Sequence, residues 1–244
     1  MKSDPYLDRR AYRALHHAAD LAYFRVTLLE SDLHIGAFCP LRGQALSALA
    51  QARTEVEAAI RANPAFLTSL EPVPPRGGEA PLVRAMLKAA KRAGVGPMAA
   101  VAGAIAGAVG RALLAHSSEV IVENGGDLFL CGVRERVVAV FAGDSPLSGK
   151  LGVRLRPGKG LGVCTSSGTF GHSLSLGRAD AALVVSPDPA LADAAATRLG
   201  NAIQSENDIA PALEDVLRVP GVIGALAVAG GKVGAKGEIE LTAL

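Results

Sequence analysis

The sequence predicts an α+β fold, with a mixed or antiparallel β-sheet core, a buried Gly/Ala-rich helix and flanking helices. Two patterns in the 244 residues lead to this class. Predicted helices and strands are segregated in blocks more than they alternate, which favours α+β over a doubly wound α/β sheet. Several of the predicted strands are separated by Gly, Asp or Pro turns, which are typical of antiparallel neighbours.

The composition indicates a packed globular protein and excludes one class of partner. The chain is 50% apolar and 20% charged, which is ordinary for a folded domain. A net charge of +2, spread along the chain, offers no basic face, and 4% aromatic residues offer few rings for stacking on bases. We therefore expect no nucleic-acid partner.

Cysteine usage and the first residues predict a cytoplasmic protein. Cys39, Cys131 and Cys164 lie far apart without CxxC spacing, so neither a zinc site nor a disulfide framework is indicated. The first residues carry acids and bases and no apolar segment of signal-peptide length. We expect a single domain over residues 1–244, with a hairpin and helices in 1–93 and a motif-bearing core in 94–244.

Local patterns predict a hairpin and two helices before this core. Residues 23–38 alternate between polar and apolar, which predicts a β-hairpin with a short polar turn at residues 30–32. Apolar residues recur at three- and four-residue steps over 44–60, which predicts an amphipathic helix. A second helix begins near Pro81, which suits the first turn, and ends at Gly94.

The next stretch, residues 93–110, contains no charged residue between Arg92 and Arg111. Its length just reaches that of a membrane span, but Ala and Gly contribute little to insertion, so we do not expect a span. A helix that is apolar on all sides must be buried, and its small residues allow close packing. Whether its first turn also touches a ligand stays open on this evidence alone.

The second half of the chain is rich in short β segments. Predicted strands lie at 119–123, 127–132, 136–143, 151–156, 160–166 and 181–187. Helices are predicted at 189–203 and around 211–217, and a terminal hairpin with a glycine-rich turn at 221–244.

The first motif is "ENGGD", residues 123–127, between two predicted strands. Its Asn-Gly-Gly sequence is strong turn chemistry, so a plain hairpin turn explains it. The functional alternative is that the two glycines let a ligand approach the backbone, while Asn124 and Asp127 supply polar contacts.

The second motif is "CTSSGTFGHS", residues 164–173, which is dense in hydroxyls and glycines. A polar loop explains it equally well. Consecutive hydroxyl and amide groups at a strand end also suit anionic ligands, and His172 is able to act as a general base near neutral pH.

The third motif is "LADAAAT", in which Asp193 and Thr197 share one face of a predicted helix. A carboxylate and a hydroxyl at this spacing can give two oxygen ligands to Mg²⁺. The structural alternative is an Asp favoured by the helix dipole together with a Thr that bonds back to its own helix.

The order of these pieces resembles the ApbE superfamily of flavin transferases. Members carry a Gly-Ile-Ala-Lys-Gly helix start, then N-x-G-G-D, T-S-G, a His and A-D-A-x-x-T. This chain reads "VGPMAAVAGAIA", "VENGGD", "TSSGTFGHSLSLGRADA" and "ADAAAT" in the same order, over roughly residues 94–200. Each motif alone is weak, but their joint order is specific, and it looks like a cytoplasmic branch of that superfamily.

The resemblance implies a flavin site that contains Mg²⁺. In the family FAD is bound, Mg²⁺ activates its pyrophosphate, and FMN is passed to a threonine of an acceptor protein. Carried over by motif, Asp193 and Thr197 would hold Mg²⁺ with a backbone carbonyl near Met98 or Ala99, and His172 would be the base for the acceptor hydroxyl. The residues implied to line the nucleotide are Asn124, Gly125, Gly126, Asp127, Thr165, Ser166, Ser167 and Gly168.

Two departures from the family pattern keep a second function open. The family lysine is absent, because the helix start reads "GPMAA" over residues 96–100. His172 is followed by "SLS" instead of the family's Ile-x-Asp-Pro. The alternative is a non-transferring accessory protein of sulfur or homocysteine metabolism on the same scaffold.

Overall fold

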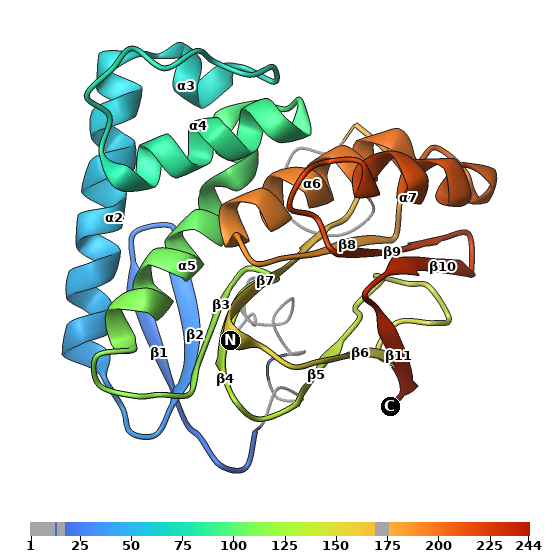
Figure 1. Cartoon of the computed structure of the whole chain (residues 1–244), viewed down its shortest axis with the longest axis horizontal. Coiled ribbons are helices and arrows are strands. Elements are labelled where there is room, and N and C mark those ends of the chain that lie inside the picture. The colour runs from blue at the N-terminus through green and yellow to red at the C-terminus, as the bar shows by residue number, and fades with distance from the viewer. Residues whose placement is uncertain (1–12, 14–17, 169–175) are drawn as a thin grey trace, which may run out of the picture.

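The structure is a computed structural model that describes residue 13 and residues 18–168 and 176–244. Helices pack on one side of a large β-sheet, and a smaller sheet packs on part of the other side (Figure 1). The strands are β1 (Ala22–Leu28), β2 (Ser31–Ala37), β3 (Val120–Asn124), β4 (Asp127–Gly132), β5 (Arg136–Ala139), β6 (Leu151–Leu155), β7 (Gly158–Ser166), β8 (Ala181–Ser186), β9 (Gly224–Ala229), β10 (Lys232–Gly237) and β11 (Glu240–Ala243). The helices are α2 (Arg42–Ala62), α3 (Ala65–Thr68), α4 (Pro81–Ala93), α5 (Val101–Leu113), α6 (Pro189–Ala202) and α7 (Ile209–Leu217), with 3₁₀ turns η2 (Pro97–Ala100) and η3 (Glu206–Asp208).

The predicted α+β class is confirmed, and the sheets are antiparallel. The large sheet has eight strands in the order β1-β2-β3-β4-β7-β8-β9-β10, and each neighbouring pair is antiparallel. The small sheet has the order β11-β6-β5 and is also antiparallel. The terminal hairpin forms as predicted from β9 and β10, with Gly230 and Gly231 in its turn.

Two element boundaries differ from the sequence prediction. The first hairpin turns at Leu29 and Glu30, because Leu28 pairs with Ser31, so Asp32 lies inside β2 and not in the turn. Asp32 is buried there and its charge is balanced by Arg25, whose Nε donates to its carboxylate over 2.6 Å. The strand predicted over 136–143 ends at Ala139.

The uncharged stretch forms a bend followed by a buried helix. Gly94 ends α4 in the left-handed region, with φ 70°, and the chain then enters η2 and α5. Most residues of α5 are buried, as predicted, and the helix packs against α2, α6 and strands β3 and β4. Among the described helices none is by itself long and apolar enough to cross a membrane; only α4 and η2–α5 taken together have the length and composition, and they are bent by 107°.

Small residues on α5 allow its neighbours to approach closely. A Cβ added at Gly103 would lie 2.3 Å from the carbonyl oxygen of Pro189 at the start of α6. A Cβ added at Gly110 would lie 2.0 Å from Cδ1 of Phe129 on β4. Glycine at these two positions therefore sets how near the helix lies to α6 and to the sheet.

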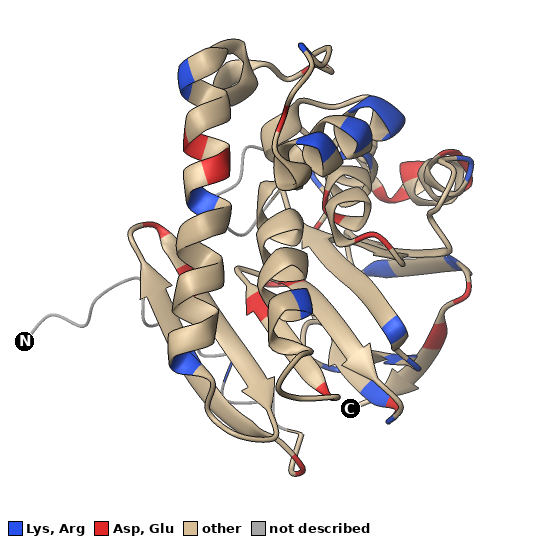
Figure 2. Ribbon diagram, turned by 60° about the vertical axis from the view of Figure 1, so that its left-hand side comes forward, with Lys and Arg blue, Asp and Glu red and all other residues tan. Residues whose placement is uncertain are grey.

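The strands of the large sheet separate two cores. On β8, Ala182 and Val184 face the helices, whereas Leu183 and Val185 face the small sheet. Because both of its faces are covered, β8 is apolar from Ala181 to Val185 and does not alternate between apolar and polar residues. Figure 2 shows both basic and acidic residues along α2, on the helical side of the sheet.

Gly110→Ala tests the packing of α5 on the sheet. The new methyl group would collide with the fully buried ring of Phe129, so we expect a loss of about 2 kcal/mol in the free energy of unfolding, although Ala favours a helix. Urea unfolding followed by circular dichroism measures it. Gly43→Ala on α2 is the control, because a Cβ there meets nothing within 4 Å; equal effects of the two substitutions would contradict the packing argument.

Candidate functional site

The "ENGGD" motif forms the two-residue turn between β3 and β4. Asn124 pairs with Asp127, and Gly125 and Gly126 have φ values of 69° and 108°, as in a type I′ turn. The hairpin-turn interpretation is therefore confirmed. The turn also contacts α5, because the side-chain amide of Asn124 donates to the carbonyl of Ala102 over 3.1 Å.

The carboxylate of Glu123 holds this turn in place through two hydrogen bonds. Its Oε1 accepts a hydrogen bond of 3.0 Å from the N–H of Gly126, and its Oε2 accepts one of 2.6 Å from Nε of Arg13. Arg13 also donates to the Asp32 carboxylate over 3.1 Å. The side chains of Arg13 and Glu123 are only 10% and 2% exposed, so this ion pair is shielded from water and holds the turn in one geometry.

Asp193 lies against the first turn of α5. Its Oδ2 accepts a hydrogen bond of 2.8 Å from the N–H of Gly103, and the N–H of Ala102 also lowers its pKa. These N–H groups have no partner within their own helix, and they carry the positive end of its dipole. A carboxylate from α6 thus caps α5, which the sequence did not indicate.

Asp127 is the second acid of the site. Its side chain is buried, and burial followed by the negative charge of Asp193 raises its pKa well above the ordinary value. Burial likewise raises the pKa of Asp193 from 3.8 to about 7. The Cys164 thiol and backbone N–H groups lower these two pKa values, but burial outweighs them, so the pair resists carrying two negative charges at once.

Cys164 belongs to the same cluster but is not poised as a nucleophile. Its Sγ lies 3.6 Å from the carbonyl oxygen of Pro189 and also contacts the Asp127 carboxylate, so its one proton has two acceptors within reach. Burial, and then the charges of Asp127 and Asp193, raise the pKa of the thiol well above its usual value. The reactive form of cysteine is the thiolate, which this environment disfavours.

The "TSSG" residues follow at the end of β7. The N–H of Thr165 helps to lower the pKa of Asp127, which places this strand end beside the β3–β4 turn. A Cβ added at Gly200 would lie 3.3 Å from Oγ of Ser166, so Ser166 lies against α6. Ser167 is partly buried, and Gly168 is exposed with its N–H bonded to Ala179.

Of the remaining predicted site residues, two lie in the described part of the chain and one does not. Thr197 is partly buried one helical turn after Asp193 on α6. Met98 is partly buried in η2, which packs against α6. His172 lies outside the described residues.

In the described structure, the candidate site thus brings the β3–β4 turn and the end of β7 close to the starts of α5 and α6. No group of three or more His, Cys, Asp or Glu side chains in this part of the chain is arranged to hold a metal. A cation at Asp193 would thus have to take further ligands from hydroxyl, backbone or substrate oxygens.

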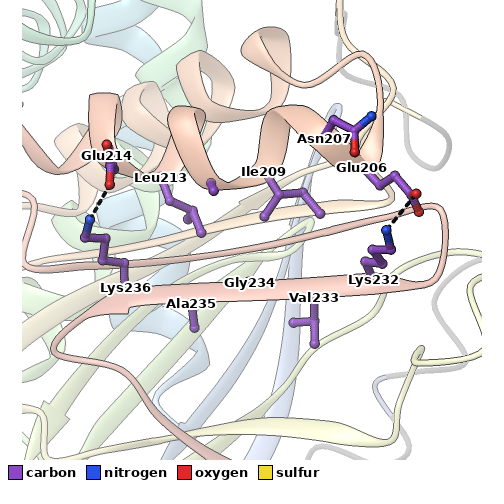
Figure 3. A pocket seen from close by; sticks show the side chains of 11 residues that line it. Glu206, Asn207, Ile209, Leu213, Glu214, Lys232, Val233, Gly234, Ala235 and Lys236 are labelled. Atoms are coloured by element: carbon purple, nitrogen blue, oxygen red, sulfur yellow. Dashed lines mark hydrogen bonds and ion pairs between the residues drawn. The ribbon is translucent and has the colours of Figure 1, made fainter.

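Two surface grooves in the described structure lie away from these motifs. One of about 340 Å³ runs between α7 and β10 over Ile209 and Leu213. Figure 3 shows its two flanking ion pairs, Lys232 with Glu206 and Lys236 with Glu214, each 2.8 Å long. The other, of about 590 Å³, lies beside β6 and the segment 237–240.

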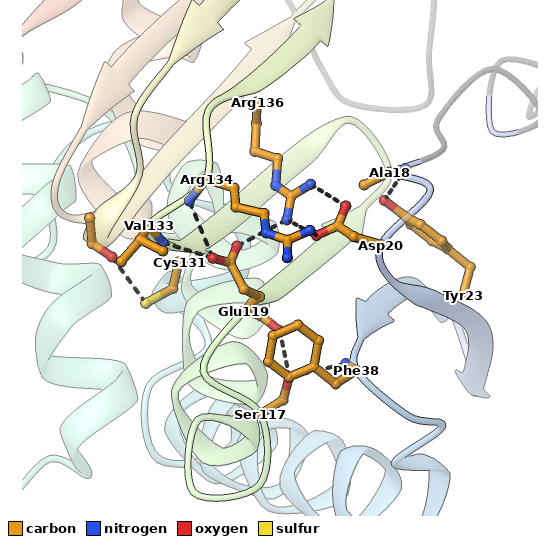
Figure 4. A network of polar contacts seen from close by, with 11 residues as sticks. Ala18, Asp20, Tyr23, Phe38, Ser117, Glu119, Cys131, Val133, Arg134 and Arg136 are labelled. Carbon is orange, nitrogen blue, oxygen red and sulfur yellow. Dashed lines mark hydrogen bonds and ion pairs between the residues drawn. The ribbon is translucent and has the colours of Figure 1, made fainter.

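A separate polar network anchors the opposite end of β3 (Figure 4). Arg136 donates to both oxygens of Asp20 over 2.8 Å and to Oε2 of Glu119 over 2.9 Å. The hydrogen bonds from Arg136 lower the pKa of Asp20 to about 2. The other oxygen of Glu119 accepts from the N–H groups of Val133 and Arg134, so the network ties β3 to the β4–β5 connection.

Sequence comparison finds relatives that span most of the chain. The family model described as AbpE bacteria matches residues 13–229. A UPF0280 protein of Methanocella arvoryzae is 42% identical over 202 residues, which cover 82% of each chain. A UPF0280 protein of Methanoculleus marisnigri is 45% identical over 191 residues, covering 78% of this chain and 77% of the relative.

Structural comparison finds the same architecture in distant proteins. The flavinyl transferase ApbE of Pseudomonas stutzeri, in its apo form, matches with a TM-score of 0.58 and 13% identity over 89% of this chain and 94% of that chain. The ApbE protein of Thermotoga maritima matches with a TM-score of 0.54 and 14% identity over 90% and 96%. At these identities the likeness establishes a common fold.

Asp193→Asn tests the electrostatics of the acid pair. Because the folded-state pKa of about 7 exceeds the ordinary 3.8, the native protein binds the extra proton, and the contribution of Asp193 to stability falls as pH rises from about 4 to 7. In chelator, the wild-type free energy of unfolding should fall relative to the variant by an amount of the order of 3 kcal/mol across this window. Urea titrations at several pH values measure it, with the exposed Asp144→Asn as control; parallel curves would overturn the assignment.

Asp20→Asn tests the second network in the opposite direction. A folded-state pKa of about 2 means that Asp20 stabilises the protein above about pH 4, and that this contribution is lost as pH falls toward 2. We expect the variant to be about 2 kcal/mol less stable at pH 7, and the gap to narrow below pH 4. Glu30→Gln removes the exposed pair with Arg53 and should change little. A gap that does not depend on pH would point to lost packing instead.

Proposed function

This chain belongs to the AbpE bacteria family, and on that premise we propose that it binds a flavin nucleotide together with Mg²⁺ at the junction of the β3–β4 turn, the end of β7 and the starts of α5 and α6. The observation that carries the proposal is the juxtaposition of Asp127 and Asp193 beside the first turn of α5. A cytoplasmic location and an acceptor protein in the same compartment are part of the proposal.

The donor groups fit a hard divalent cation. Asp127 and Asp193 are two carboxylates whose charges oppose each other in a poorly hydrated position. Their oxygens, with the hydroxyl of Thr197 and a carbonyl near Met98, are the ligand types that Mg²⁺ prefers. A cation would also lower the pKa of both acids, and so favour their charged forms at neutral pH.

The nucleotide would lie across the two glycine-containing segments. The exposed Gly125 and the partly buried Gly126 present backbone to solvent without side chains in the way. Asn124 and Asp127 flank them, and Thr165, Ser166 and Ser167 would supply hydroxyl groups from the neighbouring strand end. The start of α5 adds the positive end of a helix dipole, which favours phosphate.

The reaction we propose is transfer of FMN from FAD. The oxygen of an acceptor hydroxyl forms a bond to the phosphorus of the FMN half, and the pyrophosphate bond to AMP breaks, so AMP leaves. His172 would take the proton of the acceptor hydroxyl. When bound, Mg²⁺ neutralises charge on the phosphate under attack. Asp193 and Thr197 would orient it, and the β3–β4 turn would hold the nucleotide.

A second candidate is binding without transfer, in an accessory role in sulfur or homocysteine metabolism. The observation in its favour is the segment before α5, where Pro97–Ala100 forms a 3₁₀ turn that carries no lysine. A lysine at this point would bring a positive charge to the phosphates and assist the chemical step. Its absence therefore favours a protein that binds the nucleotide without transferring it.

The test is incubation of the purified protein with FAD and MgCl₂. We expect flavin to co-elute with the protein, AMP to be released when an acceptor is present, and Asp193→Asn to weaken Mg²⁺-dependent flavin binding at least about tenfold, as for loss of a charged ligand. Asp188→Asn is the matched control, because it keeps a good N-cap on the same helix.

The outcomes separate the candidates. Flavin binding without AMP release under any acceptor condition would favour the accessory role. Absence of flavin binding by the folded wild-type protein would refute both flavin proposals.

A further inference from the structure

Helix α4 carries a row of cations along one side. Arg84, Lys88, Lys91 and Arg92 are all exposed. At about 100° per residue they fall on one face of the helix, over a length of about 12 Å. The helix contains no Asp or Glu, and in Figure 2 it shows blue segments without red ones, unlike the neighbouring α2.

This row contrasts with the other charged surfaces. On α2, Arg53 pairs with Glu57, and at the far edge of the sheet Lys232 pairs with Glu206. Within the described residues no ion pair joins any of the four α4 cations to an acid. Arg84 helps to lower the pKa of Glu79, which precedes the helix, but the Glu79 carboxylate already accepts hydrogen bonds from the N–H groups of Arg76 and Gly77.

We propose that this face of α4, Arg84, Lys88, Lys91 and Arg92, docks an acidic segment of a partner protein. Four cations without acids favour a partner of opposite charge and steer its approach. The apolar side chains of α4 are buried in the core, so the helix offers nothing to insert into a lipid surface.

A protein partner is also favoured over a nucleic acid. The chain as a whole has a net charge of only +2 and an isoelectric point near 8.5, below the range typical of nucleic-acid-binding domains. No aromatic residue lies on α4 to stack on a base. The positive charge is local, which is typical of a patch that recognises one protein surface.

The end of α4, the helix that carries this row, is hydrogen-bonded to α6, which carries residues of the candidate flavin site. Arg198, which follows Thr197 on α6, donates from NH1 to the carbonyl of Ala93 at the end of α4 over 2.9 Å. Its Nε donates to Asp215 over 2.8 Å. Three residues separate Ala93 from η2. The end of α4 is therefore bonded to the helix that carries Asp193 and Thr197. That the docked partner is the flavin acceptor rests on the proposed function.

The experiment compares two full-length variants of equal charge. One replaces Arg84, Lys88, Lys91 and Arg92 with Gln, and the control replaces the exposed Arg61, Lys150, Lys159 and Arg218 with Gln. The probes are a short fluorescein-labelled Glu/Ser peptide, a DNA duplex and vesicles of phosphatidylserine and phosphatidylcholine. Anisotropy measures peptide and duplex binding at low and at roughly physiological salt, and co-sedimentation measures vesicle binding.

We expect the α4 variant to bind the peptide at least about tenfold more weakly than the wild type and the control, the size expected of four exposed ion pairs at low salt. Equal peptide binding by the two variants overturns the proposal. Tighter binding of duplex or vesicles that depends on the same four residues overturns the choice of a protein partner.

Flavin binding is measured in parallel, so that failure of the docking proposal can be distinguished from failure of the flavin proposal. A wild type that binds the peptide through α4 but binds no flavin would refute the flavin proposal and leave the docking surface standing. An α4 variant that binds flavin normally but not the peptide supports the docking surface.

Discussion

The candidate site depends on the tight packing of Pro189, the first residue of α6, between a helix and a strand. A Cβ at Gly103 would lie 2.3 Å from its carbonyl oxygen, and one at Gly162 on β7 would lie 2.4 Å from its Cα. Gly107 approaches its ring in the same way, with 3.0 Å to Cγ. Because none of these three residues has a side chain, α5, α6 and β7 can meet at one point, and this meeting brings Asp193, Cys164 and the first turn of α5 together.

The same packing buries the Asp193 carboxylate, and the N–H groups at the start of α5 compensate only part of the free-energy cost of burying its charge. Capping a helix N-terminus with a carboxylate is favourable by up to about 2 kcal/mol when partly buried. The rise in the pKa of Asp193 from 3.8 to about 7 corresponds to about 4 kcal/mol against the charged form at neutral pH. The cost of burying the charge of Asp193 thus outweighs the stabilisation by the Gly103 and Ala102 N–H groups at the start of α5. An arrangement that lowers stability in this way is typical of a functional site, where bound ligands supply the missing charge.

The fold was predictable where local chemistry determines it, and less so where distant residues meet. The Gly-Gly turns, the proline start of α4 and the buried nature of α5 follow from sequence pattern, and the order of motifs indicated the fold. The sequence could not indicate the Arg13–Glu123 pair, whose members are 110 positions apart, or the capping of α5 by Asp193. The turn of the first hairpin lies earlier in the chain than predicted, because Asp32, a residue type common in turns, is held inside β2 by Arg25 and Arg13.

Side-chain size on the central strands explains why the helices lie close enough for these contacts. On β9, Ala225, Ala227 and Ala229 face the helices, and Leu226 and Val228 face the small sheet. Helix α7 packs on this face of β9, whereas α6 packs on β7 and β8. There Gly162 on β7 and Ala182 on β8 are the small residues on the helical side, so α6 can approach these strands closely. Larger residues there would lift α6 and carry Asp193 away from Asp127 and α5. The geometry of the acid pair therefore depends on the size of the residues packed under α6, as well as on the polar contacts that Cys164 and Thr165 make with Asp127.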